Sequence, residues 1–211
     1  MTNAPASRRG FVLAAVIFGL TVAQLLVGTF VPGIERFEGK GYGYRLVVNP
    51  ILMAIAPLTW WFVQRRRPLP AAIPWTACAL IMASFLFDAL GNSFNLYDSI
   101  GPWDNISHFV TWLLLLGGAG LMIAHLDIQP RWVLVLLIGS LGALLAVVWE
   151  IGEWYTFIRR GTELEGAYED TLSDQLLGTT GAFLAGFIVE RLTRVGRTDL
   201  APPADATTSR G

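Results

Sequence analysis

Long apolar stretches alternate with short polar segments along almost the whole chain. Each stretch contains roughly 18 to 24 residues with few charges, which is the length that an α-helix needs to cross the hydrocarbon core of a membrane. The pattern therefore predicts an all-α fold, a polytopic transmembrane bundle of about six helices. The predicted helices occupy residues 11–31, 46–63, 71–90, 106–124, 132–155 and 170–188.

The same pattern predicts a single domain with short polar ends. We expect a cytoplasmic head at residues 1–10 and one transmembrane helical domain at residues 11–193. The remaining residues, 194–211, are rich in Pro, Ala, Thr and Ser and lack a long apolar run, so they are predicted to form a disordered cytoplasmic tail.

Two of the predicted helices contain residues that interrupt helices. The second apolar stretch is short and contains Pro50 and Pro57, so we expect it to be kinked or partly re-entrant. In the third stretch, Gly91 and Asn92 are residue types that end helices, so we expect the third helix to stop at about residue 90.

Composition excludes a soluble protein of ordinary type. Hydrophobic residues make up 54% of the chain, charged residues only 15%, and the mean hydropathy is +0.53, whereas soluble domains contain about 25% charged residues. The net charge of -1 excludes a broad basic surface for nucleic acid. The single cysteine, Cys78, cannot form an internal disulfide. The chain is thus predicted to be an integral membrane protein.

Lys and Arg residues are unevenly divided between alternate polar segments. If the N-terminus is cytoplasmic, the cytoplasmic segments hold ten of the fifteen Lys and Arg residues, and the opposite segments hold five. Cytoplasmic loops of membrane proteins retain an excess of positive charge. Both termini are therefore predicted to lie in the cytoplasm.

This topology gathers ionisable side chains at the extracytoplasmic ends of four predicted helices. Residues spaced three or four apart share one face of a helix. A charged carboxylate at membrane depth costs roughly 2.5 to 3.5 kcal/mol on insertion scales, and several carboxylates in a small volume require protons or a cation. The seven side chains are Asp88, Asp104, His108, Glu150, Glu153, Asp170 and Asp174.

A bound divalent cation is the first explanation for this group. Carboxylate oxygens with a single imidazole suit Mg, Mn or Ca, and the scarcity of His and Cys argues against a structural zinc site. His108 and Glu153 are then the candidate catalytic acid–base residues, because His exchanges protons near neutral pH. The predicted metal ligands are Asp88, Asp104, Glu150, Asp170 and Asp174.

Helix capping is the alternative explanation. Capping would not explain the acids at helix C-terminal ends, Asp88, Glu150 and Glu153, where the helix dipole disfavours negative charge. It would explain four residues of the types that cap helix N-termini. These are Asp104, Ser107, Asp170 and Ser173.

Several short motifs together resemble a known family. They are Phe87-Asp88-Ala89-Leu90-Gly91-Asn92 with Tyr97, Asp104-Asn105-Ile106-Ser107-His108-Phe109, Trp149-Glu150 with Glu153-Trp154, and Tyr168 with Asp170-Thr171, Asp174 and Gly181-Ala182. Over residues 45–190 the chain resembles the YjdF-like family of bacterial inner-membrane proteins. The resemblance implies a multi-pass protein of the bacterial inner membrane with this acidic and His set, and it implies no reaction. The spacing of Asp104 and His108 is also similar to that of VanZ-like membrane proteins, which would point to the cell envelope.

Two functional classes and one structural alternative remain open from the sequence. The first is a metal-dependent enzyme that acts on a lipid or lipid-linked envelope substrate at the outer side of the bilayer. The second is an ion- or proton-coupled transporter, because intramembrane acids are typical of both classes. The third is a non-catalytic scaffold whose acids cap helix ends. The paired broken helices of many transporters are not evident, which favours the enzyme.

Overall fold

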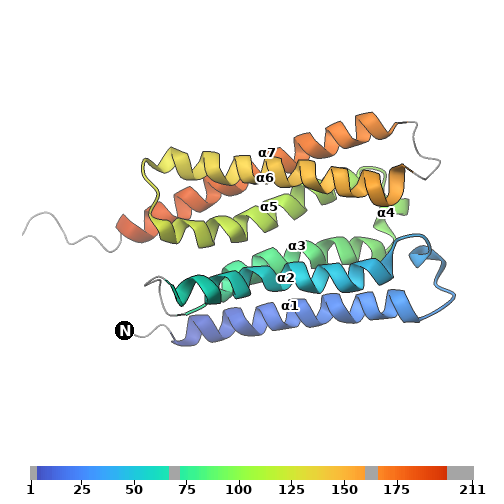
Figure 1. The fold of residues 1–211 in the computed structure, drawn as a ribbon, viewed down its shortest axis with the longest axis horizontal. Helices are drawn as coiled ribbons and strands as arrows, with labels where there is room; N and C mark the ends of the chain where they lie inside the picture. Colours follow the sequence, from blue (N-terminus) through green and yellow to red (C-terminus); the bar gives the residue numbers. More distant parts are fainter. Residues whose placement is uncertain (1–3, 67–71, 160–165, 199–211) are drawn as a thin grey trace, which may run out of the picture.

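The computed structural model describes residues 4–66, 72–159 and 166–198 (Figure 1), and all regular elements in these residues are helical. Within them, six helices are long and apolar enough to cross a membrane. The predicted all-α fold with six spans is thus confirmed. The six are α1 (Ala4–Phe30), α2 (Tyr42–Gln64), α3 (Trp75–Ser93), α5 (Trp103–Ile123), α6 (Arg131–Glu153) and α7 (Ala167–Thr198).

Short helical turns join or extend some of the long helices. The element η1 (Glu35–Phe37) lies between α1 and α2, and α4 (Leu96–Ser99) lies between α3 and α5. The turn η2 (Ala124–Leu126) follows α5, and η3 (Trp154–Ile158), a turn of π-helix, extends α6.

The six long helices form two groups of three. α1, α2 and α3 lie together, as do α5, α6 and α7, and the groups meet where α3 packs against α5 (Figure 1). In the second group, α7 packs extensively against both α5 and α6. Close packing here depends on small residues: a Cβ added at Gly142 of α6 would lie 2.1 Å from the Cβ of Ala182 of α7. Between α3 and α5, a Cβ at Gly118 would lie 2.4 Å from the carbonyl oxygen of Ala77.

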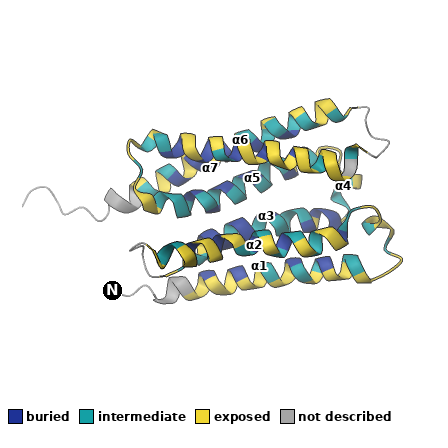
Figure 2. Cartoon of the chain, viewed as in Figure 1, coloured by how far each residue is buried: buried dark blue, intermediate teal, exposed yellow. Residues whose placement is uncertain are grey.

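The outward faces of the helices are apolar. Large aliphatic side chains are exposed along α2 and α6, including Val47, Ile51, Leu144 and Val148 (Figure 2). In water, apolar surface of this extent would drive association. The surface instead fits a multi-pass protein whose helices face lipid.

The second predicted helix differs from its sequence-based description. α2 continues without a break for 23 residues through Pro50 and Pro57 and is a candidate span, which does not fit the partly re-entrant alternative; the kink stays a prediction. Proline is tolerated in transmembrane helices because neighbouring groups and local adjustments satisfy the backbone carbonyls that it leaves free.

The end of the third helix was also predicted wrongly. α3 passes through Gly91 and Asn92 to Ser93, and the chain turns at Asn95, which has a positive φ of 57°. Gly91 serves packing instead, because a Cβ there would lie 2.6 Å from Nε1 of Trp103. The breaking residue types were recognised, but their tertiary role was not.

The ends of the chain are more helical than predicted. α1 begins at Ala4, within the predicted head, and α7 continues to Thr198, past the predicted start of the tail at residue 194. The prediction of disorder for residues 199–211 lies outside the described residues.

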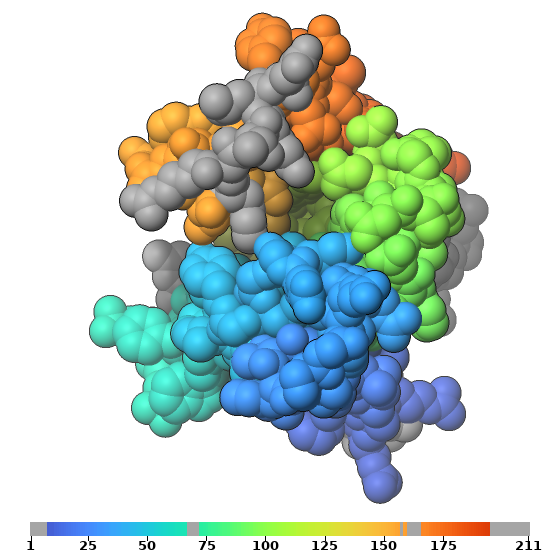
Figure 3. Space-filling view, turned by 90° about the vertical axis from the view of Figure 1, so that its right-hand side faces the viewer, coloured from blue at the N-terminus to red at the C-terminus, as the bar shows by residue number. Residues whose placement is uncertain are grey.

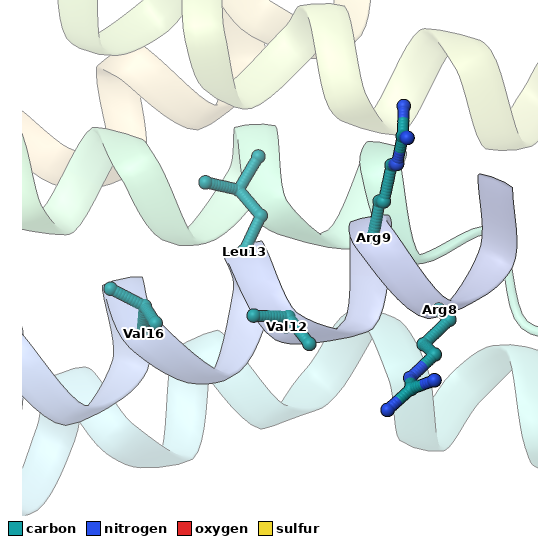
Figure 4. Close-up of a pocket in the computed structure, with 5 residues that line it drawn as sticks. All are labelled: Arg8, Arg9, Val12, Leu13 and Val16. Carbon is teal, nitrogen blue, oxygen red and sulfur yellow. The ribbon is translucent and has the colours of Figure 1, made fainter. Parts of the chain in front are cut away.

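A shallow groove lies on α1 near its start (Figure 4). Arg9 and Leu13 point to one side of the helix and Arg8 to the other. All five lining residues are exposed and belong to this one helix; they are Arg8, Arg9, Val12, Leu13 and Val16. Apolar side chains beside two Arg residues at a helix end suit lipid tails and headgroups, and the groove lies at the opposite end of the bundle from the acidic residues.

Candidate functional site

The antiparallel order of the helices brings the predicted site residues to one end of the bundle. The ends of α3 and α6 lie beside the starts of α5 and α7 (Figure 1). Figure 3 faces this end and shows a hollow between the end of α6 and start of α7, in orange, and α4 with the start of α5, in green. The seven residues nevertheless divide into separate groups.

His108 is the centre of one group. Its Nε2 lies 3.5 Å from Oδ2 of Asp174 and 3.8 Å from Oδ1 of Asp104, and its Nδ1 lies 3.9 Å from Oε1 of Glu150. Glu153 completes the group, since one ligand atom from each of His108, Glu150 and Glu153 lies within 4.8 Å of the others. We call these five residues the His108 cluster. They come from α5, α6 and α7.

Solvent exposure decreases across the His108 cluster, from the partly exposed Asp104, which we call the mouth of the site, to the buried Glu150 and Asp174. The side chain of Asp104 is 42% exposed, whereas Glu150 and Asp174 are only 7% and 3% exposed. Oδ1 of Asp174 is buried and has no hydrogen-bond partner among the described residues. No Lys or Arg in the described part of the chain forms an ion pair with the cluster. A buried, unpaired carboxylate is costly, so the cluster is incomplete without a cation or a proton.

Each glutamate of the cluster lies near a side chain that can donate a hydrogen bond. Thr171 of α7 lies near the Glu150 carboxyl group, and Trp149 lies near that of Glu153. The turn η3 follows Glu153 directly, and π-helical turns inside or beside α-helices occur frequently at functional sites.

Asp88 lies outside the His108 cluster, in a network of its own. It pairs with Arg45 of α2, and its Oδ1 accepts hydrogen bonds from the Tyr97 hydroxyl at 2.9 Å and from Nδ2 of Asn92 at 3.3 Å. The Tyr97 and Ser107 hydroxyl oxygens are 2.7 Å apart. Because Tyr97 gives its proton to Asp88, Ser107 donates to Tyr97. We call these five residues the Asp88 network.

The Asp88 network holds Tyr97 in its neutral form. Burial raises the pKa of Tyr97 first, and the adjacent Asp88 carboxylate raises this pKa further. Neutral Tyr97 keeps the proton that it donates to Asp88. With Arg45 as its counter-ion and Tyr97 as its donor, Asp88 is already satisfied, and its predicted role as a metal ligand stays a prediction.

Asp170 is also separate from the centre of the site. It is exposed in the first turn of α7, one turn before Asp174. The two groups of candidate ligands in the described residues, Asp104 with His108 and Asp174, and His108 with Glu150 and Glu153, do not include it. Its predicted role as a ligand likewise stays a prediction.

The capping explanation is wrong for the two serines. Ser107 lies inside α5 and bonds to Tyr97, and Ser173 lies inside α7 and donates to Oδ1 of Asn105 at 3.1 Å. Asp104 and Asp170 do lie in first helical turns, where the helix dipole favours an acid. Neither is the N-cap residue, because α5 and α7 begin at residues 103 and 167.

Sequence reasoning missed Arg45 and the bonding partners of Asp88. Arg45 is not among the predicted site residues, although it lies in the first turn of α2. A charge at the edge of an apolar stretch, together with an acid at the end of another, was the available signal. The hydroxyl chain from Tyr97 to Ser107 had no comparable signal, because it depends on how α4 folds back.

Comparison with known proteins identifies the family. Residues 12–194 match the family described as predicted membrane protein (DUF2238). The chain belongs to this family. The resemblance to YjdF-like proteins is confirmed at this level, whereas the likeness to VanZ-like proteins stays a prediction. No curated protein and no solved structure matched the chain. The family description states membrane location and no reaction.

Proposed function

We propose that the His108 cluster binds a divalent cation and that the protein is a membrane-embedded enzyme acting on a lipid or lipid-linked envelope substrate. The observation that supports this proposal is the convergence of carboxylates from three helices on His108. Asp104, Glu150 and Asp174 each approach an imidazole nitrogen within 4 Å. The neighbouring guanidinium of Arg45 is paired with Asp88, and no Lys or Arg among the described residues forms an ion pair with these carboxylates.

A cation accounts for the cluster better than protonation of each carboxyl group. A protonated Asp174 would need an acceptor for its hydroxyl and a partner for its other oxygen, and Oδ1 has none among the described residues. Hard carboxylate oxygens with one imidazole suit Mg or Mn, and Ca is the third candidate. Such a cation would polarise a phosphoryl or acyl group of the substrate.

The position of the cluster favours an enzyme over a transporter. The site lies at one end of the bundle and has a partly exposed mouth at Asp104, whereas transporter sites typically lie near the bilayer midplane beside broken helices. Substrate headgroups at the membrane surface would reach this mouth directly. Glu153, half-buried beside Glu150, is the candidate general base.

An ion- or proton-coupled transporter is the second candidate. The buried oxygen of Asp174 is the observation that favours it, because unpaired intramembrane acids also occur in proton and ion pathways. Cation uptake into proteoliposomes separates the two. Uptake that is lost in Asp174→Asn supports the transporter, and lipid turnover without uptake supports the enzyme.

Metal analysis tests the cation directly. Purified protein in lipid nanodiscs should contain close to one Mn, Mg or Ca per chain by mass spectrometry, and Asp174→Asn should contain almost none. Asp98→Asn is the matched control, since Asp98 is an acid at the same end that pairs with Lys40. Wild-type protein without bound Mn, Mg or Ca would overturn the cation site.

Lipid assays test the enzyme. The nanodiscs should carry phosphatidic acid or an isoprenyl phosphate, with added Mn, and released phosphate and lipid products should be measured. Turnover by wild type and none by Asp174→Asn is the expected result. No turnover of either lipid would contradict a phospholipid phosphate as substrate.

The role of His108 follows from one substitution. His108→Gln keeps the size and a hydrogen-bonding group but removes the imidazole, so loss of the cation identifies a ligand. Retention of the cation with loss of turnover identifies the acid–base residue that the sequence predicts. Both imidazole nitrogens face carboxylates, which favours a ligand.

We also propose that the site faces away from the cytoplasm in the bacterial inner membrane, with both termini inside. The distribution of Lys and Arg supports this orientation. A reporter that is active only outside the cytoplasm should give signal when fused after Ser99 and none after Arg66. The reverse result would place the His108 cluster on the cytoplasmic side.

A further inference from the structure

The two nitrogens of His108 face different carboxylates. Nε2 faces Asp104 and Asp174, whereas Nδ1 faces Glu150, and Glu153 lies near both His108 and Glu150. A neutral imidazole binds a cation through one nitrogen and carries its proton on the other. The cluster therefore offers two alternative sites, and only one of them can use His108 as a ligand at a time.

We infer that the cation lies on the Nε2 side of His108, coordinated by Asp104, Nε2 of His108 and Asp174, while Glu150 orients the ring by accepting the Nδ1 proton. This inference rests on the proposed cation site and adds which residues hold the ion. It assigns Glu150 a positioning role in place of the ligand role predicted from the sequence.

Asp174 is the first reason for choosing this side. It is 3% exposed, its Oδ2 makes the shortest contact with the ring, and its Oδ1 is buried without a partner in the described residues. Glu150 and Glu153, on the other side, each have a donor group nearby, the Thr171 hydroxyl and the Trp149 indole respectively. The carboxylate whose buried oxygen lacks a hydrogen-bond partner among the described residues is therefore the one that faces Nε2.

The distances on the Nε2 side also suit ligation. Two ligand atoms that each lie about 2.1 Å from one ion are separated by roughly 3 to 4 Å, and the 3.5 and 3.8 Å separations from Nε2 fall in this range. Asp104 is partly exposed, so the remaining coordination positions face the mouth, where water or a substrate oxygen can bind. A site that keeps open positions is typical of a catalytic metal.

Glu150 suits the second role. Metal-binding His residues almost always donate their other N–H to a carboxylate or carbonyl, which fixes the ring and its tautomer. Oε1 of Glu150 is 3.9 Å from Nδ1 and must approach by about 1 Å to accept that proton. Glu150 is buried at the end of α6, so water cannot readily replace it as the acceptor.

Mn titration of variants in nanodiscs, followed by electron paramagnetic resonance, tests the assignment. Asp174→Asn and Asp104→Asn should weaken Mn binding at least 100-fold, and Glu153→Gln less than threefold. Glu150→Leu should weaken it about 10- to 100-fold, as loss of a residue that orients a metal ligand does. Glu150→Gln should recover most of this loss, because its side-chain oxygen still accepts the Nδ1 proton.

A second measurement leaves every residue of the His108 cluster unchanged. Histidine labelled with nitrogen-15 at Nε2 alone should show strong hyperfine coupling to bound Mn, and labelling at Nδ1 alone should show the weaker coupling of a remote nitrogen. The His125→Gln background leaves His108 as the single His, since the chain has two. Asp98→Asn in that background should give the same spectra.

The outcomes separate this inference from the proposal on which it rests. Strong coupling at Nδ1, or loss of Mn in Glu150→Gln and Glu153→Gln but not in Asp174→Asn, would place the ion on the other side and overturn the inference while keeping the cation site. Equal loss in Asp104→Asn, Asp174→Asn, Glu150→Gln and Glu153→Gln would also overturn it. Wild-type protein that binds no Mn, Mg or Ca would overturn both.

Discussion

The two polar groups at the same end of the bundle contrast in how their charges are met. In the Asp88 network, one carboxylate meets one guanidinium and a hydroxyl. In the His108 cluster, four carboxylates surround one imidazole, and none pairs with a Lys or Arg of the described chain. The first group is complete without a ligand. The second is not, and this incompleteness, rather than acidity alone, indicates function.

The Asp88 network supports the position of the His108 cluster. Ser107, the last member of the hydroxyl chain from Asp88, directly precedes His108 in α5. The Asp88 network therefore fixes the first turns of α5 against α3 and α4. We expect changes in the network to lower stability, and changes in the cluster to affect ion binding first.

The largest expected effect comes from breaking the Arg45–Asp88 pair. Asp88→Asn leaves Arg45 without its counter-ion. Breaking a buried pair costs 3–5 kcal/mol, but these side chains are 22% and 25% exposed, so we expect the free energy of unfolding in detergent to fall by about 2–3 kcal/mol. Arg45→Met with Asp88→Leu should recover most of the loss. Loss of Mn binding in folded Asp88→Asn would restore Asp88 as a ligand.

Removing the cation should have the next largest effect. A ligand present at 100 times its Kd stabilises the folded state by about 2.7 kcal/mol, so chelation should lower the unfolding temperature of wild type, and added Mn should restore it. Asp174→Asn should be more stable than the chelated wild type, because it removes a buried charge, and it should not respond to Mn. If Mn raised the unfolding temperature of Asp174→Asn as much as that of Asp98→Asn, the contrast between the His108 cluster and the Asp88 network would be contradicted.

Tyr97→Phe should have a smaller effect on the Asp88 network. It removes the donor to Asp88 and the acceptor for Ser107, which should lower the free energy of unfolding by about 1–2 kcal/mol. The folded-state pKa of Tyr97 is raised above its ordinary value of 10.0. The unfolded chain therefore loses this proton first, and the contribution of Tyr97 should fall as pH rises above about 10. Tyr97→Phe should show a flatter stability profile there, and identical slopes would contradict the burial of Tyr97.

The smallest effect should come from the ion pair Lys40–Asp98. Its charged groups are 3.0 Å apart, but the Asp98 side chain is 57% exposed. Exposed ion pairs contribute about 0.2–1 kcal/mol and are weakened by salt. Lys40→Met should thus lower the unfolding temperature only slightly at low salt, and not measurably at high salt. A loss as large as that of Asp88→Asn would remove the distinction between surface and buried pairs.

The sequence predicted what depends on hydropathy and topology. Helix length follows from the bilayer, so six apolar stretches became six helices, and antiparallel order then brought the acids to one end. The sequence did not predict which residue each acid pairs with. Arg45 and Asp88 are 43 residues apart, and their contact depends on how α2 packs against α3. Likewise, the sequence around Gly91 predicts a helix end, because the packing of Gly91 against Trp103 depends on a residue twelve positions away.

Because of Pro50, the Arg45–Asp88 ion pair has a further role in holding the start of α2 in place. Pro50 has no N–H to donate to the carbonyl of Leu46, so the first turns of α2 are joined to the rest of the helix by one backbone hydrogen bond fewer. Arg45 lies in these first turns, and its ion pair with Asp88 holds them against α3. We expect loss of the Arg45–Asp88 ion pair to let the first turns of α2 move away from α3.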